Sequence, residues 1–229
     1  MNAVEAVLFD LDGTLTDSRL GILRSARHAF ERLSEAKGRP FPLPDDAELG
    51  WIVGPPLRDS FARLAGAENE EAVMAFYRQR YVPVGMFENT VYDGVPEALE
   101  ALRAPGMRLF VATSKNEHDA RRILEHFDLA KHFAGIHGAR DDGGQADKSE
   151  LIAHLVKSEG LEVGRDRIAM IGDRKYDAIG ARRVGIAAVG ALWGYGGRAE
   201  LEAAGADPIV ETPKQVPAAI AALFARQAR

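Results

Sequence analysis

We predict an α/β fold in which helices cover a parallel sheet and a second, entirely helical domain is inserted near the start of the chain. Short apolar runs typical of buried strands recur along the sequence and alternate with helical patterns. The interval between the first two runs is long and contains helical patterns only. Polar side chains follow several runs directly, as expected at the ligand-binding edge of an open parallel sheet.

The apolar runs predict the strands of the sheet. Their alternation with helices indicates crossover connections between parallel strands. The runs are Ala6–Phe9, Leu109–Ala112, Ala134–His137, Ile168–Ile171, Ile186–Val189 and Pro208–Val210.

Apolar residues at helical spacing predict helices between and after these strands. One helix includes Ala120–Phe127, with Asn116 as its N-cap. Another includes Leu151–Val156 and ends before Gly160, and the last includes Val216–Phe224.

The long interval between the first two runs predicts the inserted helical domain. Apolar stripes at helical spacing pass through residues 22–33, 57–64 and 73–81, and prolines interrupt the connections. An insertion of this length exceeds a simple crossover between strands. We therefore expect a helical cap at residues 18–86 and a core at residues 1–17 and 87–229. Because the insertion begins directly after an acidic segment, we expect it to act as a lid.

Composition excludes several classes of protein. The chain has 229 residues, of which 46% are hydrophobic and 28% charged, values typical of globular domains. Its net charge of −5 argues against binding a nucleic acid polymer. No apolar run is long enough to span a membrane, and the N-terminus lacks the pattern of a signal peptide. The absence of cysteine excludes disulfides and thiolate metal sites. We expect a cytoplasmic protein.

The segment after the first run carries the strongest functional signal. It reads Asp10-Leu11-Asp12-Gly13-Thr14-Leu15. Side chains alternate along an extended segment, so the carboxylates of Asp10 and Asp12 are expected to point the same way. Carboxylates this close repel each other and need a cation or a shared proton. One could attack an electrophile while the other transfers a proton.

Further polar residues follow the later strands and should meet at the same edge of the sheet. Thr113 and Ser114 follow the second run, and Gly172-Asp173 follows the fourth, with Asp177 four residues on. Lys148 lies where a helix begins, a position that favours anions. A nucleophile, a proton carrier, a hydroxyl, a cation and metal ligands together suit phosphoryl transfer through an aspartyl-phosphate.

These segments resemble the ordered motifs of the haloacid dehalogenase superfamily. The matching segments are Asp10–Leu15, Thr113–Lys115, Lys148–Ser149 and Gly172–Asp177. The resemblance implies a Rossmann-like core, with the helical insertion as a cap of the first type. The segments Val189–Gly196 and Gly54–Leu57 are similar to the phosphoglycolate phosphatase-like branch.

The resemblance also implies a role for each residue. Asp10 attacks phosphorus, and Asp12 protonates the leaving oxygen and then activates water. Mg²⁺ is held by Asp10, the backbone carbonyl of Asp12 and Asp173, while Asp177 binds it through water or orients the other ligands. Thr113, the Ser114 amide and the Gly13-Thr14 turn bind the phosphoryl group, and Lys148 neutralises charge on it.

The resemblance thus implies a Mg²⁺-dependent phosphatase that hydrolyses a small phosphomonoester metabolite, either phosphoglycolate-like or nucleotide-like. A sugar phosphomutase or a pyrophosphatase of the same superfamily is the alternative. From another class, a receiver-type signalling domain has similar acidic residues, but it is shorter and has no cap. An acid at Asp12 disfavours dehalogenation, since halide leaves without a proton.

Three residues have open roles. Arg58 could bind a substrate carboxylate or could be an exposed helical arginine. Trp193 and Tyr195 could contact substrate, although packing at the sheet edge is the more common role of aromatic residues. The sequence selects neither the leaving group nor the oligomeric state.

Overall fold

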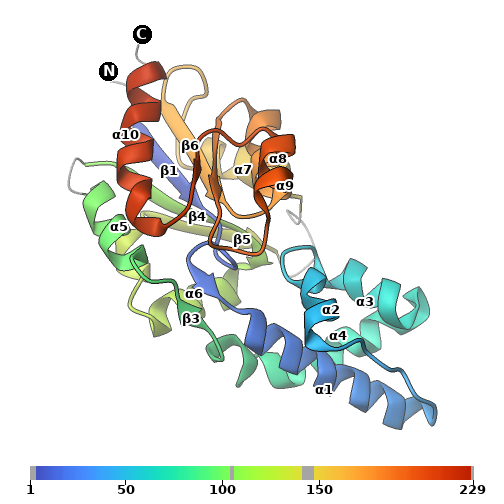
Figure 1. Ribbon diagram of the computed structural model, residues 1–229. Helices are drawn as coiled ribbons and strands as arrows, with labels where there is room; N and C mark the ends of the chain where they lie inside the picture. The colour runs from blue at the N-terminus through green and yellow to red at the C-terminus, as the bar shows by residue number, and fades with distance from the viewer. Residues whose placement is uncertain (1–3, 104–105, 141–146, 228–229) are drawn as a thin grey trace. The chain divides into compact units, whose positions relative to one another are not determined.

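The computed structural model describes residues 4–103, 106–140 and 147–227. Its chain divides into two compact units (Figure 1). The core unit comprises Met1–Thr16 and Val91–Arg229, and the helical unit comprises Asp17–Thr90. None of the helices in the described ranges is both long and apolar enough to cross a membrane.

Six parallel strands form the sheet of the core unit, in the order β5-β4-β1-β6-β7-β8. Every predicted run overlaps one of these strands, so the predicted parallel sheet is confirmed. The strands are β1 (Glu5–Phe9), β4 (Arg108–Asn116), β5 (Gly135–Ala139), β6 (Arg167–Gly172), β7 (Ala187–Ala191) and β8 (Ile209–Val210). Two short strands that the sequence did not predict, β2 (Thr16–Asp17) and β3 (Thr90–Val91), pair with each other where the chain passes between the units.

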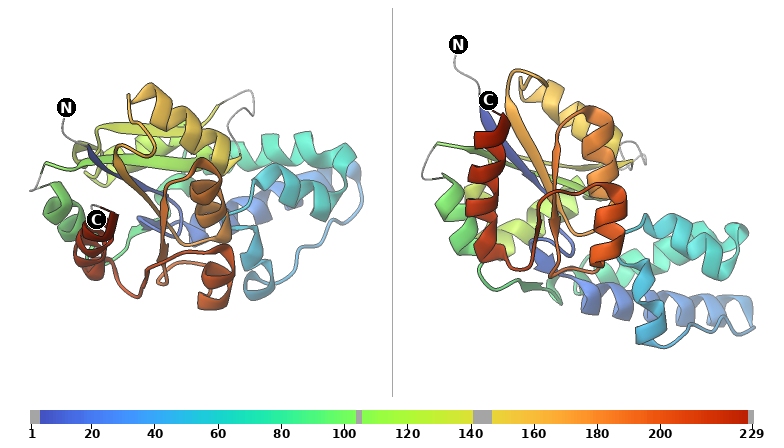
Figure 2. Two further views of the ribbon diagram at one scale, coloured as in Figure 1. Left: turned by 90° about the horizontal axis from the view of Figure 1, so that it is seen from above. Right: turned by 45° about the horizontal axis from the view of Figure 1, so that its top comes forward.

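Helices cover both faces of this sheet (Figures 1 and 2), which explains why its strands are apolar on both sides. One face packs on α7 and α8, and its buried side chains include Leu8, Phe110 and Met170. The opposite face packs on α5 and α10. The helices of the core are α5 (Val95–Arg103), α6 (Glu117–His126), α7 (Lys148–Ser158), α8 (Lys175–Val184), α9 (Arg198–Ala204) and α10 (Val216–Gln227), with 3₁₀ turns at η4 (Ala130–His132) and η5 (Pro213–Gln215).

Local signals set the ends of the predicted helices. Asn116 caps α6, because its side chain accepts hydrogen bonds from the backbone amides of His118 and Asp119. The same arrangement at Asp147 makes Lys148 the first residue of α7. That helix ends at Ser158, and Gly160 follows in a left-handed conformation with φ of 67°.

The order of the strands creates a switch point at the centre of the sheet. From β1 the chain proceeds outward to β4 and β5, then crosses to β6 and proceeds outward the other way. Ligands bind in the crevice beyond the carboxyl ends of strands at such a point. Phe9 pairs with Ile171, and the Asp10 amide donates to the Ile171 carbonyl at 2.9 Å. The residues that follow β1 and β6 therefore lie side by side.

The helical unit has its own core. Helices α1 and α3 pack on α4, and between them Phe30, Phe61, Tyr77 and Tyr81 form a chain of aromatic contacts with centroids 5.0–5.9 Å apart. Its elements are α1 (Arg19–Lys37), α2 (Asp46–Leu49), η1 (Gly50–Ile52), α3 (Leu57–Ala65), η2 (Ala67–Asn69), α4 (Glu70–Tyr81) and η3 (Gly85–Phe87). The sequence predicted the three long helices but not α2 or the 3₁₀ turns.

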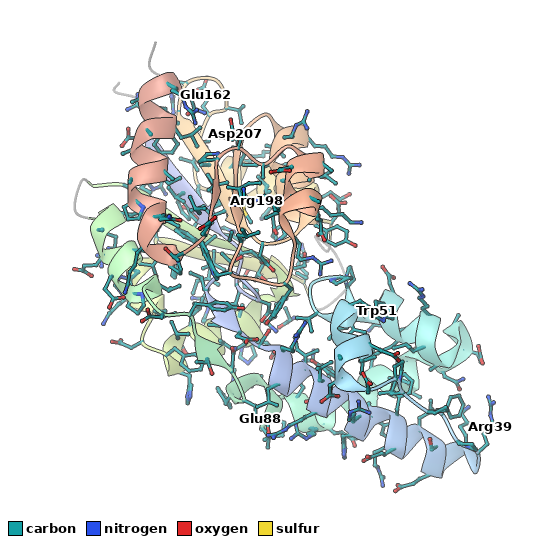
Figure 3. All side chains as sticks on the ribbon, viewed as in Figure 1. Arg39, Trp51, Glu88, Glu162, Arg198 and Asp207 are labelled. Atoms are coloured by element: carbon teal, nitrogen blue, oxygen red, sulfur yellow. The ribbon has the colours of Figure 1, made fainter. Side chains whose placement is uncertain are left out.

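Glu88, labelled in Figure 3, pairs with one arginine of α1 and one of α4. Its carboxylate accepts hydrogen bonds from Arg80 at 2.7 Å and from Arg24 at 2.8 Å. The bond from Arg80, helped by Arg24, lowers the pKa of Glu88 to about 2. Close by, Gly21 and Gly85 bring two backbone segments together, since a Cβ atom on Gly21 would lie 1.8 Å from the Gly85 carbonyl oxygen.

Candidate active site

Lys148 is the centre of a buried charge cluster beyond the ends of β1 and β6. Its ammonium nitrogen lies 2.9 Å from Asp10 Oδ1, 2.9 Å from Asp177 Oδ1 and 3.0 Å from the Ala112 carbonyl oxygen. Only 6% of the lysine is exposed. This lysine is therefore a fixed cation between two carboxylates.

Asp173 completes the cluster from the end of β6. It is fully buried, and its carboxylate accepts bonds from the Thr14 hydroxyl at 3.2 Å and the Tyr195 amide at 2.7 Å. One oxygen each from Asp10, Asp173 and Asp177 lies within 4.8 Å of the others. Three converging carboxylates are a donor set that suits a hard divalent cation such as Mg²⁺.

The fold opposes ionisation of two carboxylates in this cluster, those of Asp10 and Asp173. Burial, together with the charges of Asp177 and Asp12, raises the pKa of Asp10 to about 6 despite the opposing effect of Lys148. Burial also raises the pKa of Asp173 well above its ordinary value, and the neighbouring carboxylates of Asp177 and Asp10 add to the shift. Burial would lower the pKa of Lys148, but Asp10 and Asp177 raise it above its ordinary value. The cluster lacks positive charge, which a bound cation would supply.

Asp12 forms an ion pair with a second lysine, Lys115. Strand β1 ends at Phe9, and Asp12 forms an isolated bridge with Thr16, so the alternation of an extended strand does not govern its side chain. Its Oδ2 atom lies 2.9 Å from Lys115 Nζ. Within the described parts of the chain, Asp12 Oδ1 is buried and has no hydrogen-bond partner. The Asp12 side chain is not part of the three-carboxylate cluster; the expected metal contact of this residue is its backbone carbonyl.

A β-bulge in β4 positions the predicted hydroxyl residues. The pairing of β4 with β5 shifts between Thr113 and Asn116, and the buried Thr113 hydroxyl accepts a bond from the Lys115 amide at 3.2 Å. A Cβ atom on Gly138 would lie 2.6 Å from the Lys115 carbonyl oxygen, so only glycine allows this approach. Ser114 lies within the bulge. The strand continues past the predicted run, and Lys115, which lies where the register shifts, contacts Asp12. The sequence analysis did not predict this contact.

Gly13 and Thr14 lie directly against Asp173. Gly13 has a φ of 83°, and a Cβ atom there would lie 2.3 Å from Asp173 Oδ2. The turn after β1 therefore needs glycine for its conformation and for the space that Asp173 occupies.

Arg58 is not among the residues that the core unit brings together. It lies on α3 of the helical unit, pairs with Glu70 at 2.6 Å, and has 60% of its side chain exposed.

A family model described as haloacid dehalogenase-like hydrolase matches residues 7–191. The chain belongs to this family. The match includes all four sequence motifs and the whole of the helical unit.

Curated relatives of this chain carry several names. A 5'-nucleotidase of Pseudomonas aeruginosa is 45% identical over 199 residues, which cover 86% of each chain. The tyrosine-protein kinase PtkA of Mycobacterium tuberculosis is 42% identical over 84% of this chain and 63% of its own length. A phosphoglycolate phosphatase of Xanthomonas campestris is 32% identical over 94% of this chain and 96% of that relative.

Solved structures support the same assignment. A predicted phosphatase from Clostridium acetobutylicum superposes with a TM-score of 0.87 and 36% identity, covering 96% of this chain and all of that one. The Rossmann-like fold and the resemblance to the family are confirmed. The protein is an enzyme of the phosphatase class.

Proposed function

We propose that the protein is a Mg²⁺-dependent phosphomonoesterase that forms an aspartyl-phosphate at Asp10 and hydrolyses a small phosphorylated metabolite. The observation that carries this proposal is the convergence of Asp10, Asp173 and Asp177 around Lys148. The chain provides a nucleophile, a fixed cation and a metal-ligand set within one buried cluster.

Charge balance supports the metal. Four carboxylates, of Asp10, Asp12, Asp173 and Asp177, face two lysines, Lys148 and Lys115, which leaves two formal negative charges when all are ionised. One divalent cation balances them, and oxygen ligands favour Mg²⁺. Asp10, Asp173 and the Asp12 carbonyl would hold it, with Asp177 beside them. When bound, Mg²⁺ supplies positive charge to the phosphate oxygens and lowers the repulsion met by an attacking carboxylate.

The chain's own residues supply the remaining chemistry. An Asp10 oxygen forms a bond to phosphorus while the bond to the leaving oxygen breaks and its electron pair goes to that oxygen. Asp12 enters this step protonated and gives its proton to the leaving oxygen, and its unpaired Oδ1 is the oxygen suited to this transfer. In the second step Asp12 takes a proton from the water that attacks phosphorus, and the Asp10 carboxylate is released. Lys148 balances charge on Asp10. The Thr113 hydroxyl oxygen accepts a hydrogen bond from the Lys115 backbone amide, which leaves the hydroxyl proton available to donate to the phosphoryl group.

The helical unit would serve as the cap. It is inserted between Thr16 and Val91, a few residues after Asp12. A cap favours small substrates, because closure excludes water and bulky ligands. The names of two relatives, 5'-nucleotidase and phosphoglycolate phosphatase, favour a nucleoside monophosphate or a small carboxylated phosphoester as substrate.

Phosphate release from a panel of phosphorylated metabolites, with Mg²⁺ and with a chelator, tests this function. We expect activity on small phosphomonoesters that requires Mg²⁺, and loss of activity in Asp173→Ala. Hydrolysis of a chiral phosphorothioate substrate in isotopically labelled water should retain configuration at phosphorus, because transfer to Asp10 and then to water inverts the configuration twice. Full activity in chelator would exclude the metal, and inversion of configuration at phosphorus would exclude the covalent step. A product that keeps its phosphoryl group on another oxygen would indicate a mutase.

The substrate class can be tested separately through Arg58. If Arg58 binds a substrate carboxylate, Arg58→Ala should lower kcat/KM for phosphoglycolate about tenfold, since hydrogen bonds to charged groups contribute on this scale. Activity on a nucleoside monophosphate should change little. Arg63→Ala is a matched control, because Arg63 lies on the same helix and stacks on Trp51. Equal losses on both substrates would exclude this role.

A further inference from the structure

The segment that follows β7 lies directly on the acidic cluster. Strand β7 pairs with β6, so the two strands end at the same edge of the sheet. The Tyr195 amide donates to Asp173 Oδ2 at 2.7 Å, and the Trp193 indole nitrogen donates to the Thr14 carbonyl at 3.0 Å. The segment Trp193–Gly196 is therefore bonded to both the residue after β6 and the turn after β1.

Two glycines allow this approach. A Cβ atom on Gly194 would lie 2.3 Å from Asp173 Cβ and 2.3 Å from the Gly13 carbonyl oxygen. A Cβ atom on Gly196 would lie 1.9 Å from the Asp173 carbonyl oxygen. All three obstacles are backbone atoms or the first atom of a side chain, so none can rotate away. The backbone of this segment fits against Asp173 only because both residues lack a side chain.

Three hydrogen bonds connect Asp173, Thr14 and the Trp193–Gly196 segment in a closed ring of contacts. Asp173 accepts from Thr14 on Oδ1 and from Tyr195 on Oδ2, while Trp193 holds the carbonyl of the same Thr14. The carboxylate is thus fixed from two sides before any cation binds. Trp193 also lines a small apolar cavity together with Phe9, Leu15 and Val216.

The hydrogen bond to Thr14 also argues against a direct role of Trp193 in substrate binding. The only polar atom of its side chain is already bonded to Thr14, so direct hydrogen bonding to substrate would break the contact. If the Trp193–Gly196 segment had only a structural role, it would contribute to the stability of the fold alone. If it orients a carboxylate that binds the metal, it contributes to metal affinity as well, typically by 10- to 100-fold.

We propose that Trp193–Gly196 is the positioning segment for Asp173: it aims this carboxylate and fixes it to the turn that carries Asp12–Thr14, so that the metal site is formed before metal binds. The proposal rests on the proposed Mg²⁺ site. Trp193 and Tyr195 act through Asp173 and Thr14 and do not touch the reacting atoms.

The chain offers a matched pair of variants, because it contains two tryptophans. Trp193→Phe keeps an aromatic ring and removes the indole donor, whereas Trp51→Phe makes a similar change in the helical unit. Gly194→Ala is a second, more severe variant. The half-saturating Mg²⁺ concentration is measured from the Mg²⁺-induced rise in melting temperature of all four proteins. Tryptophan fluorescence of Trp51→Phe, whose sole indole is Trp193, provides an independent titration.

We expect Trp193→Phe to raise the half-saturating Mg²⁺ concentration about tenfold. Gly194→Ala should raise it further, and Trp51→Phe should leave it unchanged while its fluorescence responds to Mg²⁺. If Trp193→Phe melts at a lower temperature but binds Mg²⁺ as tightly as the unaltered protein, the segment is only structural and the proposal is wrong. An unaltered protein that does not respond to Mg²⁺ would instead overturn the proposed metal site. If Gly194→Ala does not fold, Trp193→Phe still decides between these outcomes.

Discussion

The two units of this protein each contain a group of charges, and the groups differ in the direction of their pKa shifts. In the core, burial raises the pKa values of Asp10 and Asp173. In the helical unit, the hydrogen bond from Arg80 lowers the pKa of Glu88 to about 2. A lowered carboxylate pKa means that the fold favours the charge, and a raised one means that the fold opposes it. We interpret the Glu88 group as stabilising and the group of Asp10 and Asp173 as held in place for chemistry, a difference that variants can test.

The largest expected effect comes from Asp10→Asn. Turnover should fall about 10⁴-fold or more, because the variant removes the proposed nucleophile. Stability in chelator should nevertheless increase near pH 7, since the variant removes a charge that the fold opposes. The sign follows from linkage: unfolded Asp10 titrates near 3.8 and folded Asp10 at about 6, so the folded state loses stability as pH rises through that interval.

Melting temperatures in chelator near pH 7 and pH 4 measure this effect. The gain of Asp10→Asn over the unaltered protein should be present near pH 7 and small near pH 4. A variant that is less stable near pH 7 would show that the Lys148 pair outweighs burial and repulsion, and would break the comparison.

Lys148→Met should have the next largest effect. It leaves the buried carboxylates of Asp10 and Asp177 without their shared cation, which costs about 3–5 kcal/mol for a broken buried pair. Urea unfolding in chelator measures the loss, and saturating Mg²⁺ should recover part of it. Lys131→Met, an exposed lysine paired with Asp128, is the control and should change little. Equal stability of both variants would contradict a central role for Lys148.

Glu88→Gln should have the smallest effect, a loss of about 1 kcal/mol near pH 7, because its arginine partners are partly exposed and screened by solvent. The folded pKa of about 2 lies below the ordinary value of 4.5, so the contribution of Glu88 is complete above 4.5 and is lost as pH falls toward 2. Thermal unfolding of both proteins near pH 7 and pH 3 checks this. A difference that grows on acidification would have the wrong sign.

The sequence predicted elements that depend on local pattern. Apolar runs identified the strands, and the Asn116 cap identified the start of α6, because both signals lie within a few residues of the element. The order of the motifs also placed Asp10, Asp173, Asp177 and Lys148 at one edge of the sheet, since parallel strands end together.

Contacts that depend on packing were not predictable in this way. The Asp12–Lys115 pair joins the turn after β1 to the part of β4 where the register shifts, and residue spacing alone does not predict that shift. The bonds from Trp193 and Tyr195 join residues far apart in sequence, and nothing in the spacing of Gly194 and Gly196 identifies Asp173 as the group they accommodate. The Glu88 cluster likewise requires that α1 and α4 bring Arg24 and Arg80 together.

The contact of Gly21 with Gly85 has a consequence for the history of the protein. Together with the Gly21 amide, which donates to the Glu88 carbonyl at 3.1 Å, it closes the helical unit where the chain enters and leaves it. An insertion whose ends are already adjacent imposes little additional loop-closure entropy on its host, whatever its length. Such a unit can be exchanged, enlarged or shortened while the sheet keeps its register and the acidic cluster stays unchanged.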